Sequence, residues 1–336
     1  MKHSSRVPAF GHAAAMKGRR LFITGGAGFI GSRLCERLVA DNQVTVYDSL
    51  ARNALRHTTV AQHPNLRVVR GDILDPAALR AAVEAADPDV VLHMAAIAGI
   101  DTVIKSPTRT MAVNIIGAHN LLQALQPRVA SLERVVMFST SEVFGSAAYK
   151  VHERHNTNLA PVGEARWTYS VSKLAAEHMA IAYAREFGLR AVALRPFNVY
   201  GPGQVGEGAI HVFVKRAIAG LPLEVHGDGD QIRSWCYIDD MVDGVLLALT
   251  KEEAVGEVFN IGNPRGTITI LSLAEKVVAL SGSSSPIRLV PKTYVDVDLR
   301  VPDISKATQR LGYAARVDLN EGLEHTIAWY RTQGAA

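Results

Sequence analysis

The chain has 336 residues, of which 48% are hydrophobic, 20% charged and 6% aromatic, and these fractions exclude a largely disordered or low-complexity protein. Lys and Arg total 36 against 32 Asp and Glu, a formal charge of +4. No run of five like charges occurs, so the composition favours a small anionic ligand over a nucleic acid. Cys35 and Cys236 lie far apart without a metal-ligand pattern, and no apolar stretch approaches the ~18 residues that span a bilayer. We therefore expect a cytoplasmic protein with no disulfide framework, no metal site and no membrane segment.

The first part of the chain alternates between short apolar runs and helical patterns. The runs are rich in Val, Leu and Ile, as strands buried on both faces of a parallel sheet are. They lie at Arg20–Thr24, Gln43–Tyr47, Leu66–Arg70, Val90–His93, Arg134–Phe138 and Arg190–Arg195. The helical patterns lie at Gly31–Ala40, Pro76–Ala85, Arg109–Ala124 and Tyr169–Phe187. This alternation predicts an α/β fold built on a doubly wound parallel sheet.

The composition of the sequence changes near residue 200, where Gly and Pro cluster at Gly201–Gly208. A helix that ends at Ala219 and a turn at His226–Gln231 are predicted to follow. Later elements are a strand at Val258–Ile261 and helices at Asp240–Leu249, Leu271–Ser281, Asp303–Leu311 and Asn320–Arg331. We expect residues 1–15 to be a flexible extension and residues 201–336 to form mainly a smaller lobe, whose segments interleave with the sheet domain at residues 16–200.

A glycine-rich segment, TGGAGFIG, follows the first predicted strand and opens a helix. Gly25, Gly28 and Gly31 would let the backbone turn tightly and approach a pyrophosphate at the helix N-terminus. Their spacing is one residue longer than the commonest dinucleotide motif. Asp48 ends the next strand, where its carboxylate can bind both ribose hydroxyls and repel a 2′-phosphate, unless it is only a turn residue. The pattern predicts NAD, rather than NADP, as cofactor.

Tyr169 and Lys173 stand four positions apart in a predicted helix, so both side chains project from one face. A nearby ammonium group favours the phenolate and is expected to lower the pKa of Tyr169, which suits a base that removes a hydroxyl proton. In the segment STSEVFG, Thr140, Ser141 and Glu142 follow a strand and would point into the same site. The alternative is a strand-ending turn with an exposed glutamate.

These landmarks resemble the extended short-chain dehydrogenase/reductases, in particular the NAD-dependent nucleotide-sugar epimerases, dehydratases and decarboxylases. The resemblance runs from about Arg19 to Arg331. It is carried by TGGAGFIG, Asp48, GDI at 71–73, HMAA at 93–96, Asn114, STSE at 139–142, YSVSK at 169–173, RPFNVYGPG at 195–203 and GDGDQIRSWCYIDD at 227–240. It implies a Rossmann-like NAD-binding domain at residues 16–200 and a C-terminal lobe that binds a nucleoside diphosphate sugar.

The resemblance also implies roles for individual residues. Thr140, Tyr169 and Lys173 match the catalytic triad of the family, and Asn114 matches a residue that supports the lysine through a water molecule. Two further matches, Asn198 and Arg233, are positions that contact the substrate, which agrees with the anion-binding chemistry of arginine. The cofactor site expected from these matches consists of Gly25, Gly28, Phe29, Ile30, Gly31, Asp48, Asp72, Ile73, Ala95, Asn114, Tyr169 and Lys173. Asp72 could reach the adenine amino group or cap a helix.

Members of this family begin alike, by oxidising C4 of the sugar to a ketone, and differ in the residues beside the triad. Dehydratases typically carry Asp-Glu after the threonine, where this chain has Ser141-Glu142, and 4-epimerases usually lack the carboxylate. The trio Thr140-Ser141-Glu142 and the segments RWTYSVSK and DVDLRVPDISKA resemble UDP-glucuronate decarboxylases. In the second segment Arg300 matches an arginine that acts near the substrate carboxylate. Decarboxylation of UDP-glucuronate is therefore the favoured interpretation, with a UDP-sugar 4-epimerase and a 4,6-dehydratase as alternatives.

Three further hypotheses accompany this interpretation. Arg300 could instead form an ion pair with Asp298 or Asp303. An NAD-binding regulatory protein without catalysis is the alternative from a different class, although the triad is intact. The resemblance finally implies a homodimer that pairs through the helices at Arg109–Leu125 and Tyr169–Phe187. Apolar residues recur on them at helical spacing and could face a partner or the protein's own sheet: Met111, Ile115, Leu122, Ala176, Ala180 and Tyr183.

Overall fold

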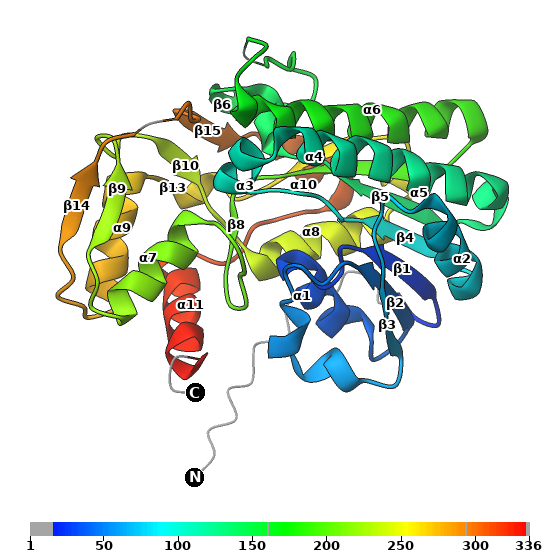
Figure 1. Ribbon diagram of the computed structural model, residues 1–336, viewed down its shortest axis with the longest axis horizontal. Coiled ribbons are helices and arrows are strands. Elements are labelled where there is room, and N and C mark those ends of the chain that lie inside the picture. Colours follow the sequence, from blue (N-terminus) through cyan, green and yellow to red (C-terminus); the bar gives the residue numbers. More distant parts are fainter. Residues whose placement is uncertain (1–15, 160, 293, 334–336) are drawn as a thin grey trace.

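A seven-stranded parallel sheet forms the centre of the computed structural model, which describes residues 16–159, 161–292 and 294–333 (Figure 1). The strand order is β12-β7-β5-β4-β1-β2-β3. The strands are β1 (Arg20–Thr24), β2 (Gln43–Asp48), β3 (Leu66–Arg70), β4 (Val90–His93), β5 (Arg134–Phe138), β7 (Ala191–Pro196) and β12 (Val258–Ile261). Each predicted strand is present within one residue at either end. The doubly wound α/β fold is confirmed.

Helices cover both faces of this sheet because successive strand residues point to opposite sides. On β1, Leu21 and Ile23 pack into one core with α1 (Phe29–Leu38) and α8 (Ile238–Thr250). Phe22, between them in sequence, packs into the other core. That second core also contains residues of α2 (Pro76–Ala86), α5 (Gly117–Leu125) and α6 (Thr168–Phe187).

Local signals explain where these helices begin and end. Asp75 caps α2 by accepting hydrogen bonds from the backbone N–H groups of Ala77 and Ala78, at 3.1 and 3.0 Å, and Pro76 occupies the first turn. Asp87 then adopts the left-handed conformation that ends the helix. The helix predicted at Arg109–Ala124 begins earlier, as α4 (Pro107–Met111), and reaches α5 through a π-helical turn at Ala112–Ile116.

Outside the central sheet lie short strands that the sequence analysis does not predict. A four-stranded sheet has the order β13-β10-β15-β6, with β6 (Ala147–Val151), β10 (Ile232–Ser234), β13 (Thr267–Thr269) and β15 (Leu299–Pro302). There are also two strand pairs: β8 (Val199–Tyr200) with β11 (Cys236–Tyr237), and β9 (Leu223–His226) with β14 (Ile287–Val290). These strands of two to five residues are too short to show a hydrophobic period, and their partners are distant in sequence.

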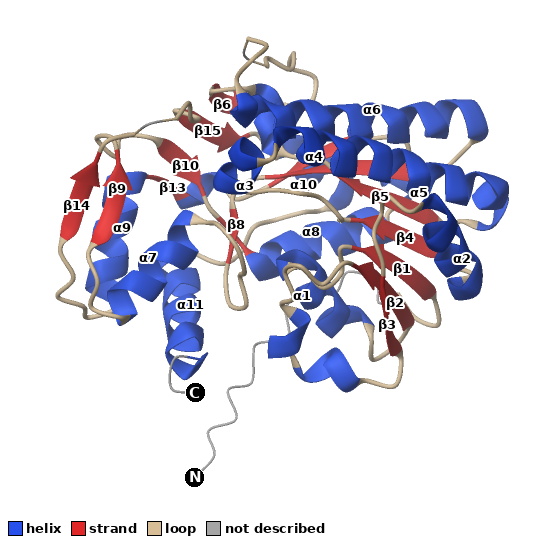
Figure 2. Ribbon diagram, in the orientation of Figure 1, coloured by secondary structure: helices blue, strands red, loops and turns tan. Residues whose placement is uncertain are grey.

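The remaining helices are α3 (Ile100–Lys105), α7 (Ala209–Ile218), α9 (Ile270–Leu280), α10 (Ser305–Leu311) and α11 (Leu319–Gln333). Figure 2 shows α7, α9 and α11 gathered beside β9 and β14, at the opposite end of the molecule from β3. Meanwhile β12 joins the central sheet although it follows residue 200. The domain boundary near residue 200 stays a prediction, and the predicted extension at 1–15 lies outside the described residues. Within the described part of the chain, no helix is both long and apolar enough to cross a membrane.

Candidate active site

A cavity of about 600 Å³ opens at the carboxyl ends of β1, β2 and β4 and extends to α6. The strand order reverses here, since β2 lies on one side of β1 and β4 on the other. Ligands of doubly wound sheets bind at such a point. The cavity brings together the predicted residues Gly25, Gly28, Phe29, Ile30, Gly31, Asp48, Asp72, Ile73, Ala95, Thr140, Tyr169 and Lys173.

The glycine-rich loop leaves room for a dinucleotide backbone. Gly25 has φ of +72°, and a Cβ atom there would lie 2.4 Å from the backbone nitrogen of Ala95, so only glycine permits this approach. The helix α1 begins just beyond Gly28. Because Gly28 has no side chain, no side chain at this position caps the first N–H groups of the helix. Gly28, Phe29 and Ile30 line the cavity. The uncapped N-terminus of α1, which lines the cavity, therefore suits the pyrophosphate of NAD.

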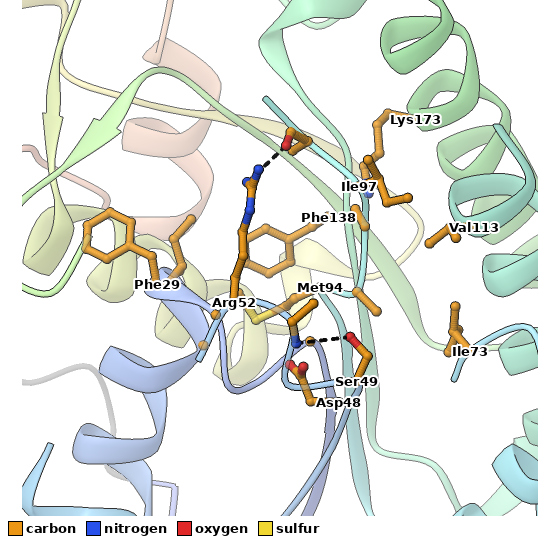
Figure 3. Close-up of a pocket in the computed structure, with 18 of the residues that line it drawn as sticks. Phe29, Asp48, Ser49, Arg52, Ile73, Met94, Ile97, Val113, Phe138 and Lys173 are labelled. Atoms are coloured by element: carbon orange, nitrogen blue, oxygen red, sulfur yellow. Dashed lines mark hydrogen bonds between the residues drawn. The ribbon is translucent and has the colours of Figure 1, made fainter. Parts of the chain in front are cut away.

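Asp48 stands between this loop and the loop after β2, on the cavity wall (Figure 3). Its carboxylate accepts hydrogen bonds from the N–H groups of Ala27 and Leu50, at 3.0 and 2.7 Å. Burial raises the pKa of Asp48, although these two hydrogen bonds oppose the increase. The backbone thus holds the carboxylate facing the cavity, which is what recognition of ribose hydroxyls requires.

Asp72 also lines the cavity but does not cap a helix, because Asp75 performs that role for α2. The side chain of Asp72 accepts a hydrogen bond from Leu74 N at 3.0 Å, and its carbonyl oxygen accepts one from the Tyr47 hydroxyl at 3.0 Å. The adenine-binding role of Asp72 stays a prediction.

The pKa of Tyr169 does not follow the expectation from its neighbour Lys173. Burial and the negative charge of Glu142 raise the pKa of Tyr169, and a hydrogen bond with Thr140 only partly opposes them. Burial also lowers the pKa of Lys173 to about 8, against the attraction of Glu177. The predicted lowering of the tyrosine pKa is therefore wrong for the protein alone, because burial disfavours the charged form of both groups.

Asn114 lies in the π-helical turn and does not line the cavity. Its side chain makes two hydrogen bonds with the backbone of Ile97, accepting at 2.8 Å and donating at 3.1 Å. It donates a third to Ser172 Oγ at 2.9 Å. Asn114 therefore joins the loop after β4 to α6, beside Lys173, and its predicted water-mediated contact with the lysine stays a prediction.

A buried ionic cluster adjoins the triad and centres on Glu142. Thr140 caps the 3₁₀ turn Ser141–Phe144 that carries Glu142. Arg166 binds the Glu142 carboxylate with both terminal nitrogens, one of them at 2.9 Å, and Arg300 Nη1 lies 3.5 Å from Glu142 Oε1. Burial alone would raise the pKa of Glu142, but the charges of Arg166 and Arg300 outweigh it and lower the pKa. Glu142 is therefore an ionised, half-buried carboxylate and not an exposed turn residue.

The cluster extends to the predicted substrate residue Arg233. Arg233 Nη2 lies 3.1 Å from Asp296, and Asp296 lies 3.9 Å from Arg166. Arg300 pairs with Glu142 instead of Asp298 or Asp303 and donates a hydrogen bond to Gly145 O at 3.3 Å. In the described chain, three arginines thus meet two carboxylates, and one positive charge is left over. This excess suits an anionic ligand.

Two predicted residues, Ser141 and Asn198, make contacts outside the ionic cluster, whereas the structure adds Asp296 to it. Ser141 is buried next to Glu142, and Asn198 donates a hydrogen bond to Ser234 O at 3.4 Å from a left-handed conformation with φ of +27°. Neither lines the cavity, and Glu142, Arg233 and Arg300 do not line it either. The sequence analysis assigns no role to Asp296, and it uses Arg166 only as part of the segment RWTYSVSK that supports the decarboxylase interpretation. The segments RWTYSVSK and DVDLRVPDISKA contain both, but only the fold brings them to Glu142.

Comparison with known proteins places the chain in a family. A profile described as NAD dependent epimerase/dehydratase family matches residues 21–262. UDP-glucuronic acid decarboxylase 1 of Arabidopsis thaliana is 34% identical, covering 98% of this chain and 73% of that protein. UDP-N-acetyl-alpha-D-glucosaminuronate decarboxylase of Bacillus cytotoxicus is 32% identical, covering 93% of this chain and 98% of that protein.

Solved structures agree with this placement. UDP-glucuronic acid 4-epimerase from Bacillus cereus, in complex with UDP-glucuronic acid and NAD, is 32% identical with a TM-score of 0.84, and the match covers 95% of this chain and all of that one. UDP-glucose 4-epimerase of Thermus thermophilus, in complex with NAD, is 27% identical with a TM-score of 0.83. As its motifs predict, the chain is an enzyme that uses NAD and belongs to the NAD-dependent epimerase/dehydratase family.

Proposed function

We propose that this enzyme decarboxylates UDP-glucuronate through a 4-keto intermediate. The observation that carries the proposal is the pair of the buried Arg300 and the half-buried Glu142 next to Tyr169, in a cluster with one positive charge in excess. A sugar that bears a carboxylate would neutralise this excess, whereas a neutral hexose would leave it buried and uncompensated. Several similar proteins are named UDP-glucuronic acid decarboxylases, which supports the same choice.

The cavity residues match the first part of such a reaction. Bound NAD supplies a hydride acceptor, so that the C4 hydroxyl can become a ketone. Tyr169 is the base for the hydroxyl proton, and Thr140, which lines the same cavity, orients that hydroxyl. Lys173, with its pKa near 8, lies one helical turn away from Tyr169. The protonated form of Lys173 stabilises the Tyr169 phenolate. The resulting β-keto acid can release CO₂ because the C4 carbonyl accepts the electron pair.

Two arginines of the ionic cluster, Arg166 and Arg300, contact Glu142 in different ways and have different roles in the proposed reaction. Arg166 binds Glu142 with two nitrogens, whereas Arg300 makes one longer contact, at 3.5 Å. We therefore assign Arg166 to hold Glu142 and Arg300 to bind the substrate carboxylate. A second carboxylate near Glu142 raises the pKa of Glu142. Glu142 can then take up a proton and deliver it to C5 when CO₂ leaves.

A direct assay tests this proposal. The protein is incubated separately with UDP-glucuronate, UDP-glucose, UDP-N-acetylglucosamine and their 4-epimers, and the products are followed by mass spectrometry and NMR. Loss of the mass of CO₂ from UDP-glucuronate alone is the expected result. Loss of water instead would overturn the proposal in favour of a 4,6-dehydratase.

A UDP-sugar 4-epimerase is the second candidate, and the ionisation of Glu142 favours it. Because Arg166 and Arg300 lower the pKa of Glu142, this group is a poor proton donor before substrate binds. In an epimerase, Arg300 and Glu142 would serve only in binding. Inversion at C4 with no change of mass would establish this reaction.

We also propose a cytoplasmic homodimer that pairs through α4, α5 and α6. Leu122, Ala176 and Ala180 are fully buried in the protein's own core and are not available to a partner. Ile116, in the π-helical turn, and Val171, on α6, are 49% and 37% exposed. These two residues are the apolar contacts that such a partner would cover.

A further inference from the structure

Arg52 connects two walls of the NAD cavity. It lies in the loop after β2, four residues beyond Asp48, and it lines the cavity together with Ala98 and Thr102 from the segment after β4. Arg52 donates hydrogen bonds to Ala98 O at 3.0 Å and to Thr102 Oγ1 at 3.1 Å. Its side chain therefore spans the distance between loops that follow strands on opposite sides of β1.

Glu207 binds both Arg52 and Thr102 from a third segment of the chain. It lies in the glycine-rich loop Gly201–Gly208. Another residue of this loop, Val205, lines the cavity. The Glu207 carboxylate accepts hydrogen bonds from Thr102 Oγ1 at 2.7 Å and from Arg52 at 3.3 Å. We call Arg52, Thr102 and Glu207 the clasp.

Glu207 also completes the N-terminus of α3. That helix has Gly99 before its first residue and no capping side chain of its own. The Glu207 carboxylate accepts hydrogen bonds from the N–H groups of Asp101 and Thr102, at 2.8 and 3.3 Å. A Cβ atom at Gly99 would lie 2.7 Å from the carboxyl group of Glu207. Three chain segments far apart in sequence thus depend on one carboxylate.

We propose that the clasp retains NAD in its cavity. A dinucleotide that fills this cavity lies between the walls that Arg52 joins, so Arg52 must detach from Ala98 and Thr102 before the cofactor can leave. The side chains of Arg52 and Glu207 are 40% and 31% exposed. Hydrogen bonds and ion pairs at such positions are individually weak, so the clasp can open without unfolding the protein. Glu207 is thereby a cofactor-retaining residue outside the catalytic machinery, whichever sugar is the substrate.

The test measures release of the reduced cofactor in the absence of nucleotide sugar. Protein loaded with NADH is mixed with excess NAD in a stopped-flow instrument, and the loss of NADH fluorescence gives the dissociation rate constant. We expect Glu207→Gln and Arg52→Gln each to release NADH about tenfold faster, since each loses charge-assisted hydrogen bonds of the clasp. The double variant should be no faster than the faster single variant, because both remove the same structure.

Glu224→Gln is the matched control, because Glu224 forms an ion pair with Arg216, at 2.7 Å, outside the residues that line the cavity. It should release NADH at the native rate. The variant Glu207→Gln could also destabilise α3, so a second variant, Thr102→Val, is tested. Thr102→Val removes the hydroxyl that contacts both Arg52 and Glu207 but keeps the backbone N–H groups that Glu207 binds. Native release rates in folded Arg52→Gln and Thr102→Val variants would overturn the proposal. Because no sugar is present, a negative decarboxylation assay has no bearing on this result.

Discussion

Arg233 and Arg300 occupy paired positions on the neighbouring parallel strands β10 and β15. Both side chains are buried. Burial lowers the pKa of Arg300 to about 10, and the charges of Arg233 and Arg166 add to this effect while Glu142 opposes it. Like charges so close together destabilise a folded protein unless anions compensate them. Glu142 and Asp296 compensate two of the three arginines, and the third charge is available to a ligand.

This arrangement predicts that Arg300→Gln selectively weakens binding of carboxylated sugars. We expect the affinity for UDP-glucuronate to fall about ten- to a hundredfold, the cost of losing a hydrogen bond to a charged group. The affinity for UDP-glucose should change little. Isothermal titration calorimetry with both ligands measures the difference, and Arg288→Gln, at an exposed position on β14, is the control. An equal loss for both sugars would show that Arg300 does not recognise the carboxylate.

Tyr169→Phe is predicted to remove most turnover and to leave binding intact. The substitution deletes only the phenolic oxygen that accepts the proton, and loss of a general base typically lowers the rate by about 10²- to 10⁴-fold. Product formation and nucleotide-sugar affinity are measured in parallel. Tyr149→Phe, which changes an exposed tyrosine on β6, should behave as the native enzyme. Turnover at the native rate in Tyr169→Phe would exclude Tyr169 as the base.

The low pKa of Lys173 predicts that the difference in stability between the native protein and Lys173→Met depends on pH. Burial lowers this pKa from 10.5 to about 8, so between these values the unfolded chain binds more protons than the folded protein, and native stability rises with pH. Below about pH 8 the penalty for the buried charge is fully present. Lys173→Met should therefore be more stable than the native protein at about pH 7, by on the order of 1–3 kcal/mol.

The advantage of Lys173→Met should shrink as the pH approaches 10, because the native protein then loses its buried charge. Urea unfolding at about pH 7 and about pH 9.5 gives both free energies. Lys251→Met, at an exposed position after α8, controls for loss of a lysine as such. A constant difference between variant and native protein at both pH values would contradict the prediction.

Asp48 predicts selectivity for NAD over NADP. Its carboxylate faces the cavity, held by the N–H groups of Ala27 and Leu50, and would repel a 2′-phosphate. The dissociation constant for NADP should exceed that for NAD by about tenfold or more. Asp48→Ser should narrow this ratio, whereas Asp228→Ser, on an exposed turn, should preserve it. Equal or tighter binding of NADP by the native protein would refute the assignment.

The proposed homodimer predicts that Ile116→Asp and Val171→Asp together yield a monomer. Each places a charge on a surface that pairing would bury, and an unpaired buried charge disfavours association. Light scattering after size-exclusion chromatography, at micromolar protein, measures the mass. Val212→Asp introduces the same charge at an exposed apolar position of α7 and should leave the mass unchanged. A monomeric native protein would remove the basis for this prediction.

The sequence alone determined the central sheet and the use of NAD, for a local reason. A strand buried on both faces is an apolar run, and a glycine-rich turn before a helix is visible within eight residues of sequence, TGGAGFIG. Tyr169 and Lys173 likewise sit on one face of one helix, which spacing alone reveals. The strands outside the central sheet carried no such signal, because each is short and finds its partner far along the chain.

Only the tertiary structure decided which charges meet. Arg166, Glu142, Asp296 and Arg300 lie on different segments, and their contacts arise from the packing of β15 against β6 and of α6 beside the turn that carries Glu142. The clasp depends in the same way on the packing of the loop Gly201–Gly208 against the segments that follow β2 and β4. The pKa of Tyr169 rises rather than falls because burial, a property of the whole fold, outweighs the spacing of two residues on one helix.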